Sequence, residues 1–550
     1  MTPSRAVPAA LALAAGLALA PLSAATATPA AADPAAPAPA SAPAPASAPA
    51  PASAPAAGTD RLLVKFRAGT APGTAEDVLA ARAPELAAAG PGTAPTVDGA
   101  AVLTAPGELD EDRLAALTTA LQQDPAVEYA APDVRASTAF VPNDPSYAGL
   151  QWSLWDDPAG VGMPLAWDRA TGAGQTIAIV DTGITAHPDL DANVLPGYDF
   201  VSLPENGRDG DGWDADPTDM GDYPDAALCP GSPMAPASSW HGTHTAGIAA
   251  ADGNNGIGVT GVAPDARILP VRAVGACSQG YISDVAAGIA WAAGAPVPGA
   301  PANANPADVV SVSLAVPGAQ CPAVLQSAIT EATSRGVTVV VAAGNQGIDA
   351  AGSVPANCAG AVSVAATDVS GAMPAYSNFG AVTLAAPGGD PWAQVHSTGN
   401  AGAQQQGAPT YIGRNGTSMA APVVAGTVAL MREAAPGLSP QAVRELLTST
   451  ARTAPGGCAL GCGAGIVDPV SAVIAAQGGQ PFTVAGGIGG LHQRIAATAG
   501  APVSRELCAL GGTPCFQEFE AGWIVWNAGA GARWLPGLLP AQWWAIGAPA

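Results

Sequence analysis

The chain has 550 residues, enough for three or four domains of about 150 residues each. Its 43 acidic and 19 basic residues give a formal net charge of −24 at pH 7. So acidic a surface repels phosphate backbones, which argues against nucleic acid as a partner. Beyond the N-terminal segment there is no run of about 18 apolar, uncharged residues, so we expect no membrane-spanning helix.

Residues 1–27 have the pattern of a secretory signal peptide. One cationic residue, Arg5, precedes an apolar stretch at residues 7–22, and small residues follow, ending in Ala-Thr-Ala at residues 25–27. A membrane anchor is the alternative, which the shortness of the apolar stretch disfavours. We therefore expect a secreted, extracellular protein.

An oxidising compartment favours disulfides over metal ligation for the eight cysteines. Eight cysteines allow 105 pairings. We predict pairing between nearest neighbours, because each bridge then closes a modest loop within one region. The predicted bridges are Cys229–Cys277, Cys321–Cys358, Cys458–Cys462 and Cys508–Cys515.

The next two segments differ sharply in composition. Residues 28–58 are almost only Ala, Pro and Ser, which predicts an extended, disordered linker. In residues 59–137 the hydrophobic pattern predicts strands near 61–66, 95–97, 100–103 and 126–130, and helices near 75–83 and 110–123. The order β-α-β-β-α-β predicts a small ferredoxin-like α+β unit.

From residue 141 to about residue 477, short apolar strands alternate with helical stretches. The strands are predicted at residues 176–180, 266–271, 309–313, 337–341 and 361–365. Largely apolar strands between helices predict an α/β fold, with a parallel sheet covered by helices on both faces. Such sheets carry their chemistry at the carboxyl ends of the strands.

Four polar residues stand at the expected places. Asp181 ends an apolar strand, His241 and Ser418 begin apparent helices, and Asn345 follows the most apolar strand. A serine hydroxyl becomes a nucleophile when an imidazole takes its proton and a carboxylate orients that imidazole. Taken alone, each of these residues is more simply explained as a structural residue of a turn, a helix cap or a loop. Together they predict nucleophilic catalysis, with Asn345 as a donor to an oxyanion.

The surrounding motifs resemble those of the subtilisin-like (subtilase, S8 family) serine peptidases, in the order Asp, His, Ser. They read Ile-Val-Asp-Thr-Gly around Asp181, His-Gly-Thr-His-Thr-Ala-Gly from His241, and Asn-Gly-Thr-Ser-Met-Ala-Ala-Pro around Ser418. The resemblance covers residues 141–477 and implies a subtilisin-like fold. It also implies an orienting Asp181, a general acid and base His241, a nucleophilic Ser418, and an oxyanion hole containing Asn345.

The resemblance also implies a substrate site. Ser313, Leu314 and Ala315 match the family's substrate-binding strand, and Ala342, Ala343 and Gly344 match the opposite wall. The family usually has glycine where this chain has Ala315. We therefore expect a narrowed pocket that accepts small or medium apolar P1 residues, and a Cys321–Cys358 bridge that braces it.

An aspartate-rich stretch predicts a structural Ca²⁺ site, since crowded carboxylates repel one another unless a cation lies among them. Some secreted subtilases carry a similar calcium-binding loop. A solvated acidic loop is the alternative. The predicted ligands are Asp209, Asp211, Asp214, Asp216, Asp219 and Asp222.

The resemblance gives the flanking regions a role. Residues 59–137 resemble the inhibitory pro-domain of a subtilase, with self-cleavage expected within residues 137–141. Residues 483–550 resemble an LGFP repeat of wall-associated proteins and contain five tryptophans. Tryptophan rings suit stacking on cell-wall glycans, and a tryptophan core that stabilises a small cap is the alternative.

We interpret the chain as a secreted, monomeric, self-processing serine endopeptidase that acts on proteins or peptides and is inhibited by its own pro-domain. The C-terminal module predicts contact with the cell wall. A specific, envelope-anchored processing protease is one alternative. A catalytically silent binding protein is another, which the intact set of Asp181, His241, Asn345 and Ser418 disfavours.

Overall fold

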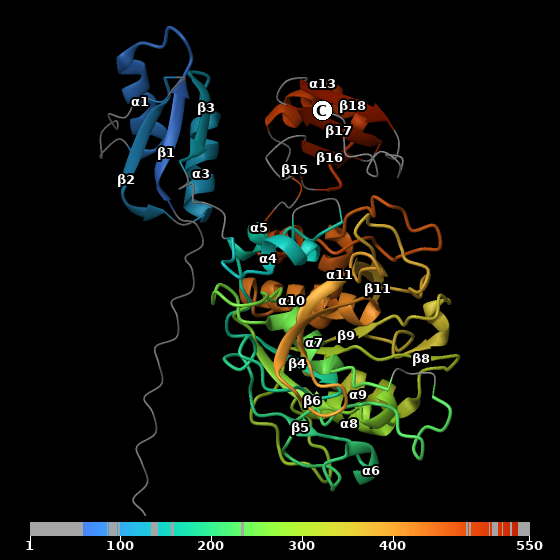
Figure 1. Cartoon of the computed structure of the whole chain (residues 1–550). Coiled ribbons are helices and arrows are strands. Elements are labelled where there is room, and N and C mark those ends of the chain that lie inside the picture. The colour runs from blue at the N-terminus through green and yellow to red at the C-terminus, as the bar shows by residue number, and fades with distance from the viewer. Residues whose placement is uncertain are drawn as a thin grey trace, which may run out of the picture. The chain divides into compact units, whose positions relative to one another are not determined.

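The computed structural model describes residues 59–84, 86, 96, 99–109, 111–133, 141–155, 159–232, 236–479, 482, 486–504, 506–508, 515–519, 521–527 and 531–536. The predicted signal peptide, the linker and most of the expected cleavage region lie outside these residues. The chain divides into two units, residues 1–132 and 133–550, each described by itself (Figure 1). In the described residues, no helix is long and apolar enough to cross a membrane.

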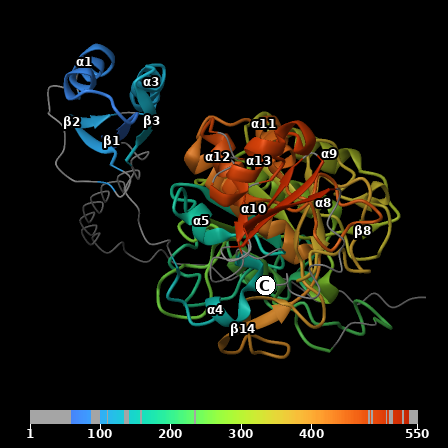
Figure 2. The same ribbon diagram turned by 90° about the horizontal axis from the view of Figure 1, so that it is seen from above.

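The first unit has an antiparallel sheet of strands β1 (Thr59–Phe66), β2 (Ala101–Leu109) and β3 (Val127–Pro132), in the order β2-β1-β3. Helices α1 (Pro72–Arg82) and α3 (Glu111–Gln122) lie on one side of it (Figure 2). Alternate residues Leu62 and Val64 of β1 are fully buried in the core between them. The strand expected near residues 95–97 falls largely outside the described part, so the ferredoxin-like order stays a prediction.

The second unit is built on a seven-stranded parallel sheet with the order β12-β11-β9-β7-β4-β6-β5. The predicted parallel sheet is therefore confirmed. Its strands are β4 (Thr176–Asp181), β5 (Tyr198–Asp199), β6 (Arg267–Arg272), β7 (Val309–Val312), β9 (Thr338–Ala342), β11 (Val362–Thr367) and β12 (Leu384–Pro387).

Helices cover both faces of this sheet, as predicted (Figure 1). In β4, Ile177 and Ile179 enter one core and Ala178 and Val180 enter the other, as the alternation of strand side chains requires. The first core includes residues of α5 (Met163–Trp167), α7 (His241–Ala250), α10 (Thr417–Ala434), α11 (Pro440–Thr450) and α12 (Pro469–Ala476). The second includes residues of α8 (Ile282–Ala292) and α9 (Ala323–Ser334).

Short elements complete this unit. Strands β8 (Val316–Pro317) and β10 (Ser353–Val354) form an antiparallel pair, as do β13 (Val395–Asn400) and β14 (Pro409–Arg414). Helices α4 (Tyr147–Leu150) and α6 (Pro204–Gly207) have a single turn each. Disulfides join Cys229 to Cys277, Cys321 to Cys358 and Cys458 to Cys462.

The C-terminal region contains α13 (Gly486–Ala499) and an antiparallel sheet of β15 (Leu507–Cys508), β16 (Cys515–Phe519), β17 (Gly522–Asn527) and β18 (Gly531–Pro536). Trp526 and Trp534 pack into the core that includes residues of α13, and Trp523 is buried against Phe516. Three of the five tryptophans are therefore core residues, and the other two lie outside the described part. Cys515 is disulfide-bonded and pairs with Cys508 in the register of β15 and β16, where the Cys508 side chain is not described.

Candidate active site

The candidate catalytic residues follow the carboxyl ends of the parallel strands. Asp181 is the last residue of β4, Ser313 follows β7, and Asn345 comes three residues after β9. His241 is the first residue of α7, and Ser418 lies in the first turn of α10. Since α7 packs against both β4 and α10, segments distant in sequence are brought to one edge of the sheet.

Asp181 and His241 form a direct hydrogen-bonded pair. The Nδ1 atom of His241 lies 2.7 Å from Oδ1 and 2.9 Å from Oδ2 of the Asp181 carboxylate, which is fully buried. The Thr182 N–H donates to Oδ1 at 2.8 Å, and the Thr245 hydroxyl donates to Oδ2 at 3.2 Å. Burial alone would lower the pKa of His241, but the charge and hydrogen bond of Asp181 outweigh it and raise that pKa above its usual value.

Ser418 is buried and is hydrogen-bonded to Ser313, the residue that directly follows β7. Its hydroxyl donates to the carbonyl oxygen of Ser313 at 3.1 Å, and the Ser313 hydroxyl donates to the carbonyl of Ser418 at 3.0 Å. No hydrogen bond joins Ser418 to His241 among the described side chains. Catalytic hydrogen bonds are often long or misaligned before substrate binds, so this arrangement is compatible with a nucleophile and its base.

Asn345 is oriented by the residue that precedes Ser418. Its side-chain oxygen accepts from the backbone N–H of Thr417 at 2.8 Å and from the Thr417 hydroxyl at 3.0 Å. The amide NH₂ group of this exposed side chain is therefore directed away from Thr417. The first turn of α10 is also the positive end of the helix dipole, which favours a negatively charged oxygen.

A cavity of about 460 Å³ lies beside the Asp181–His241 pair. The predicted residues Ser313, Leu314 and Ala315 line it. Ala342, Ala343 and Gly344, predicted as the opposite wall, are buried but are not among its lining residues. Further lining residues, which the motifs did not predict, are Thr182, Ser239, Val274, Ser278, Gln279, Gly280, Ile282, Val285, Val312, Val316, Leu325, Val354 and Pro355.

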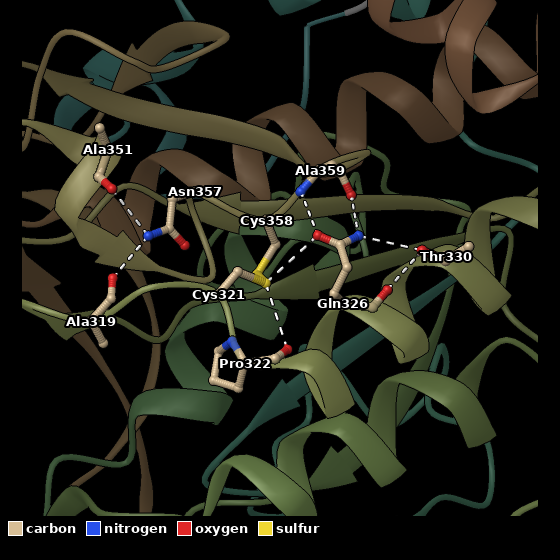
Figure 3. The surroundings of a disulfide bond; sticks show 9 residues. All are labelled: Ala319, Cys321, Pro322, Gln326, Thr330, Ala351, Asn357, Cys358 and Ala359. Carbon is tan, nitrogen blue, oxygen red and sulfur yellow. Dashed lines mark hydrogen bonds between the residues drawn. A yellow bond between two sulfur atoms is a disulfide. The ribbon is translucent and has the colours of Figure 1, made fainter.

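The wall near Val354 differs from the prediction because of a pairing that no local pattern reveals. Val316 of β8 pairs with Val354 of β10. Behind this pair the Cys321–Cys358 disulfide links the segments that follow the two strands (Figure 3). The side chain of Gln326 accepts from the N–H of Ala359 at 2.8 Å and donates to its carbonyl at 2.9 Å. The bridge and this side chain fix the wall against α9.

The six aspartates predicted as calcium ligands do not converge on one point. In the described residues, no three His, Cys, Asp or Glu side chains are grouped to hold a metal ion. Asp209 and the buried Asp199 both accept from the Arg272 guanidinium, Asp219 accepts from the Thr182 hydroxyl at 2.6 Å, and Asp222 accepts from serine donors. The predicted ligand set therefore stays a prediction, and in the structure protein donors are bonded to Asp209, Asp219 and Asp222.

The remaining three aspartates, Asp211, Asp214 and Asp216, lie near the surface. A hydrogen bond between the carboxyl groups of Asp211 and Asp214 is the main reason that the pKa of Asp211 is raised. Asp216 accepts from the N–H of Thr218 at 3.1 Å. Two adjoining carboxylates at the surface are a combination that a hard cation would satisfy.

Comparison with known proteins places these motifs in context. The subtilase family model matches residues 172–465, more than half of the chain, and the LGFP repeat model matches residues 500–550. An extracellular protease of Xanthomonas campestris is 46% identical over 383 residues, which are 69% of this chain and 65% of that protein. An extracellular basic protease of Dichelobacter nodosus is 42% identical over 370 residues, which are 66% of this chain and 60% of that protein.

A solved structure of a protease from Pseudoalteromonas arctica has a TM-score of 0.59 and 45% identity, and the match covers 61% of this chain and 100% of that chain. This likeness supports the subtilisin-like fold. The chain spans less than two thirds of the length of the two curated relatives.

Proposed function

The chain belongs to the subtilase family, and from this premise we propose that it is a serine endopeptidase that hydrolyses peptide bonds through Asp181, His241 and Ser418. The observation that carries the proposal is the Asp181–His241 hydrogen bond at 2.7 Å beside a cavity lined by the substrate strand. The strand residue Ser313 is in turn hydrogen-bonded to Ser418.

In the proposed reaction, the Ser418 hydroxyl turns from the Ser313 carbonyl toward a bound peptide and attacks its carbonyl carbon. Nε2 of His241 takes the hydroxyl proton, and Asp181 stabilises the resulting imidazolium. The NH₂ group of Asn345 and the N–H of Ser418 donate to the oxyanion. His241 returns the proton to the leaving amine, and a water molecule hydrolyses the acyl-enzyme by the same steps.

A fluorophosphonate probe tests the nucleophile. We expect covalent labelling of Ser418 in the wild-type protein and none in Ser418→Ala, together with hydrolysis of a peptide anilide by the wild type alone. A correctly folded wild-type protein that is neither labelled nor active would contradict the peptidase and favour the silent binding protein. A cleavage profile restricted to one sequence would favour the specific processing protease.

We further propose that residues 59–137 form an inhibitory pro-domain that the enzyme removes itself. Parallel sheets have many non-local contacts and fold slowly, so a folded template attached to the chain is physically reasonable. Ser418→Ala is expected to accumulate as the unprocessed precursor. Maturation of that variant in cells would show that another protease performs the cleavage.

The proposed P1 preference is for small or medium apolar residues. Val312, Val316, Leu325 and Val354 give the cavity an apolar lining, and Ala315 adds a methyl group where the family usually has glycine. A library of peptides should show cleavage after Ala, Val or Leu. A profile dominated by Arg or Lys at P1 would contradict this preference.

We propose that Ca²⁺ binds the acidic loop at Asp211 and Asp214, where it would relieve the repulsion between adjoining carboxylates. Excess chelator is expected to lower the melting temperature at pH 8, and Asp211→Asn should remove this effect. A melting temperature that does not change with chelator would refute the proposal.

Secretion and wall association are proposed for the whole chain. The two curated relatives are named extracellular proteases, and the match to the LGFP repeat indicates a C-terminal binding module. We expect a monomer whose module, residues 483–550, binds cell-wall glycan. Sedimentation of the full chain with purified wall material, compared with a chain ending at residue 480, measures this binding.

A further inference from the structure

A buried carboxylate outside the catalytic pair contacts two different segments of the site. Asp222, which is 1% exposed, accepts from the backbone N–H and the hydroxyl of Ser239, the latter at 2.6 Å. It also accepts from the hydroxyl of Ser278. In addition, the N–H of Ser278 donates to the backbone carbonyl of Asp222 at 3.2 Å. Both carboxylate oxygens are therefore engaged.

The two segments that Asp222 joins both line the cavity. Ser239 and His241 contribute to it from the segment that starts α7, and Ser278, Gln279 and Gly280 contribute from the segment between β6 and α8. An extended peptide that pairs with the substrate strand Ser313–Ala315 would run between these segments. Asp222 itself does not line the cavity, so it acts on the site through the residues that it holds and through its charge, which helps to raise the pKa of His241.

Both segments contain non-glycine residues in the left-handed backbone region. Trp240 has a φ of 51°, and Cys277 and Ser278 have φ values of 63° and 49°. Such conformations are unfavourable for residues with a side chain and persist only when the surroundings fix them. Asp222 bonds Ser239, which precedes Trp240, and it bonds Ser278 directly. The hydrogen bonds of Asp222 therefore hold the residues at or next to these left-handed positions, which would otherwise change to a more favourable backbone conformation.

Neighbouring groups complete the support of each segment. The Arg414 guanidinium donates to the carbonyl of Ser239, so two side chains together engage the N–H, the carbonyl and the hydroxyl of this residue. The indole N–H of Trp240 donates to the carbonyl of Gly402 at 2.7 Å. Cys277 is bonded to Cys229 in the same loop as Asp222.

We propose that Asp222 is a positioning residue with two separate effects: through Ser239 it places His241, and through Ser278 it sets the distance between the two walls of the substrate cavity. This inference rests on the proposed peptidase function. Asp222 is then a support of the substrate cavity and not a metal ligand, since its two carboxylate oxygens already accept hydrogen bonds from three donors of the protein.

The two arms of Asp222 predict different kinetic losses, which variants can separate. Ser278→Ala removes only the hydrogen bond from the Ser278 hydroxyl to Asp222. This bond supports the wall formed by Ser278, Gln279 and Gly280, here called the distal wall, so the loss should appear chiefly as a higher KM for a tetrapeptide anilide. Ser239→Ala weakens the link to the histidine segment and should lower kcat. Asp222→Ala removes both links and should show both losses, each about tenfold or more, since hydrogen bonds to a charged group are worth about ten- to hundredfold.

The control is Asp225→Ala, a loss of the same charge three residues further along the loop. Within the described part of the chain, its carboxylate accepts only from the N–H of Ala227, at 2.7 Å, in its own turn. A single-residue ester that does not reach the distal wall serves as the second substrate, for which Ser278→Ala should change KM little. All values are normalised to the fraction of Ser418 labelled by the fluorophosphonate probe, which removes differences in folding or maturation.

The outcomes are distinct. A higher KM for the tetrapeptide in Ser278→Ala, a lower kcat in Ser239→Ala and both in Asp222→Ala, with Asp225→Ala like the wild type, would support the proposal. Equal kinetics for Asp222→Ala and Asp225→Ala would overturn it, as would equal losses on both substrates in Ser278→Ala. If Asp222→Ala does not fold, the two serine variants still decide. An inactive wild type would instead overturn the peptidase itself.

Discussion

Replacement of Asp181 by Asn is the sharpest perturbation of the proposed reaction, because it preserves shape and removes only the charge. The Thr182 N–H, 2.8 Å from Oδ1, can only donate, so the amide oxygen of the introduced asparagine should occupy that position. The amide NH₂ then takes the Oδ2 position, which lies 2.9 Å from Nδ1 of His241. The amide oxygen stays 2.7 Å from the same nitrogen, so the imidazole is no longer held in a single tautomer. The tautomer that avoids a donor facing the NH₂ group carries its proton on Nε2, and that nitrogen then cannot accept the proton of Ser418.

The magnitude combines two losses. The wrong tautomer costs the hydrogen bond to a charged group, about 1.5–3 kcal/mol, and the imidazolium also loses its buried counter-charge. A combined cost of about 5–6 kcal/mol corresponds to about 10⁴ in kcat, which is the loss known for the equivalent change in another serine protease. The assay is hydrolysis of a tetrapeptide anilide between pH 5 and 10. Before the assay, added wild-type enzyme removes any uncleaved pro-domain from the variant, and the added enzyme is then inhibited.

The pH profile gives an independent reading of the same contact. His241 must be neutral to act as a base, so activity is present above its pKa and is lost as the pH falls through it. Since Asp181 raises the pKa of His241, the acid limb of the wild type should lie above the ordinary histidine value of about 6.5. In Asp181→Asn, burial and the charge of Arg414, which both lower the pKa of His241, are opposed only by the charge of Asp222, so the limb should move down. The reasoning is refuted if Asp181→Asn keeps a tenth of the wild-type kcat, or if the acid limb of its pH profile does not move. The control is Asp265→Asn, which makes the same change at an exposed aspartate.

Three further changes test other parts of the site and its support. Asn345→Ala should lower kcat by about 10²–10³ with little change in KM, the loss known for the equivalent donor of a subtilisin, and a KM effect alone would contradict an oxyanion role. Ala315→Gly should raise kcat/KM for Phe relative to Ala at P1 by up to about tenfold, and an unchanged ratio would place the constriction elsewhere. Glu433 accepts three backbone N–H groups, of Thr171, Gly172 and Ala173, at 2.6–3.0 Å. Glu433→Ala should therefore lower the free energy of unfolding by about 2 kcal/mol relative to the exposed Glu445→Ala, measured by denaturant titration, and equal stabilities would count against this contact.

The parallel sheet was predictable from the sequence because a strand that is buried on both faces appears as a short, continuous run of mainly apolar residues. Strands such as β7 and β9 are apolar except for one buried hydroxyl residue each, Ser311 and Thr338, and each strand lies between helical segments. The proposed catalytic residues could also be selected from the sequence, since Asp181, His241 and Ser418 stand in dense local motifs with glycines beside them. In both cases the information lies within a few residues of the feature.

Long-range partners were not predictable in the same way. Val316 pairs with Val354, and apart from the predicted Cys321–Cys358 bridge a few residues further on, nothing near either residue specifies the other. The six aspartates of the acidic loop look alike in sequence. Their environments differ because Arg272, Thr182 and Ser278 reach them from distant segments. Local composition therefore predicted a cluster of charge, whereas tertiary contacts decide what each carboxylate does.

The three proposed catalytic residues differ in how firmly regular structure holds them. Asp181 ends a strand that is paired on both sides, with β6 and β7, and Ser418 lies in an 18-residue helix whose first fifteen residues are buried. His241 is the first residue of α7 and follows the left-handed Trp240, which makes no side-chain cap. The histidine segment therefore depends on side chains, among them Asp222 and Arg414, for a rigidity that the other two segments obtain from the backbone. Changes at Asp222 should accordingly reach catalysis through His241 before they affect Asp181 or Ser418.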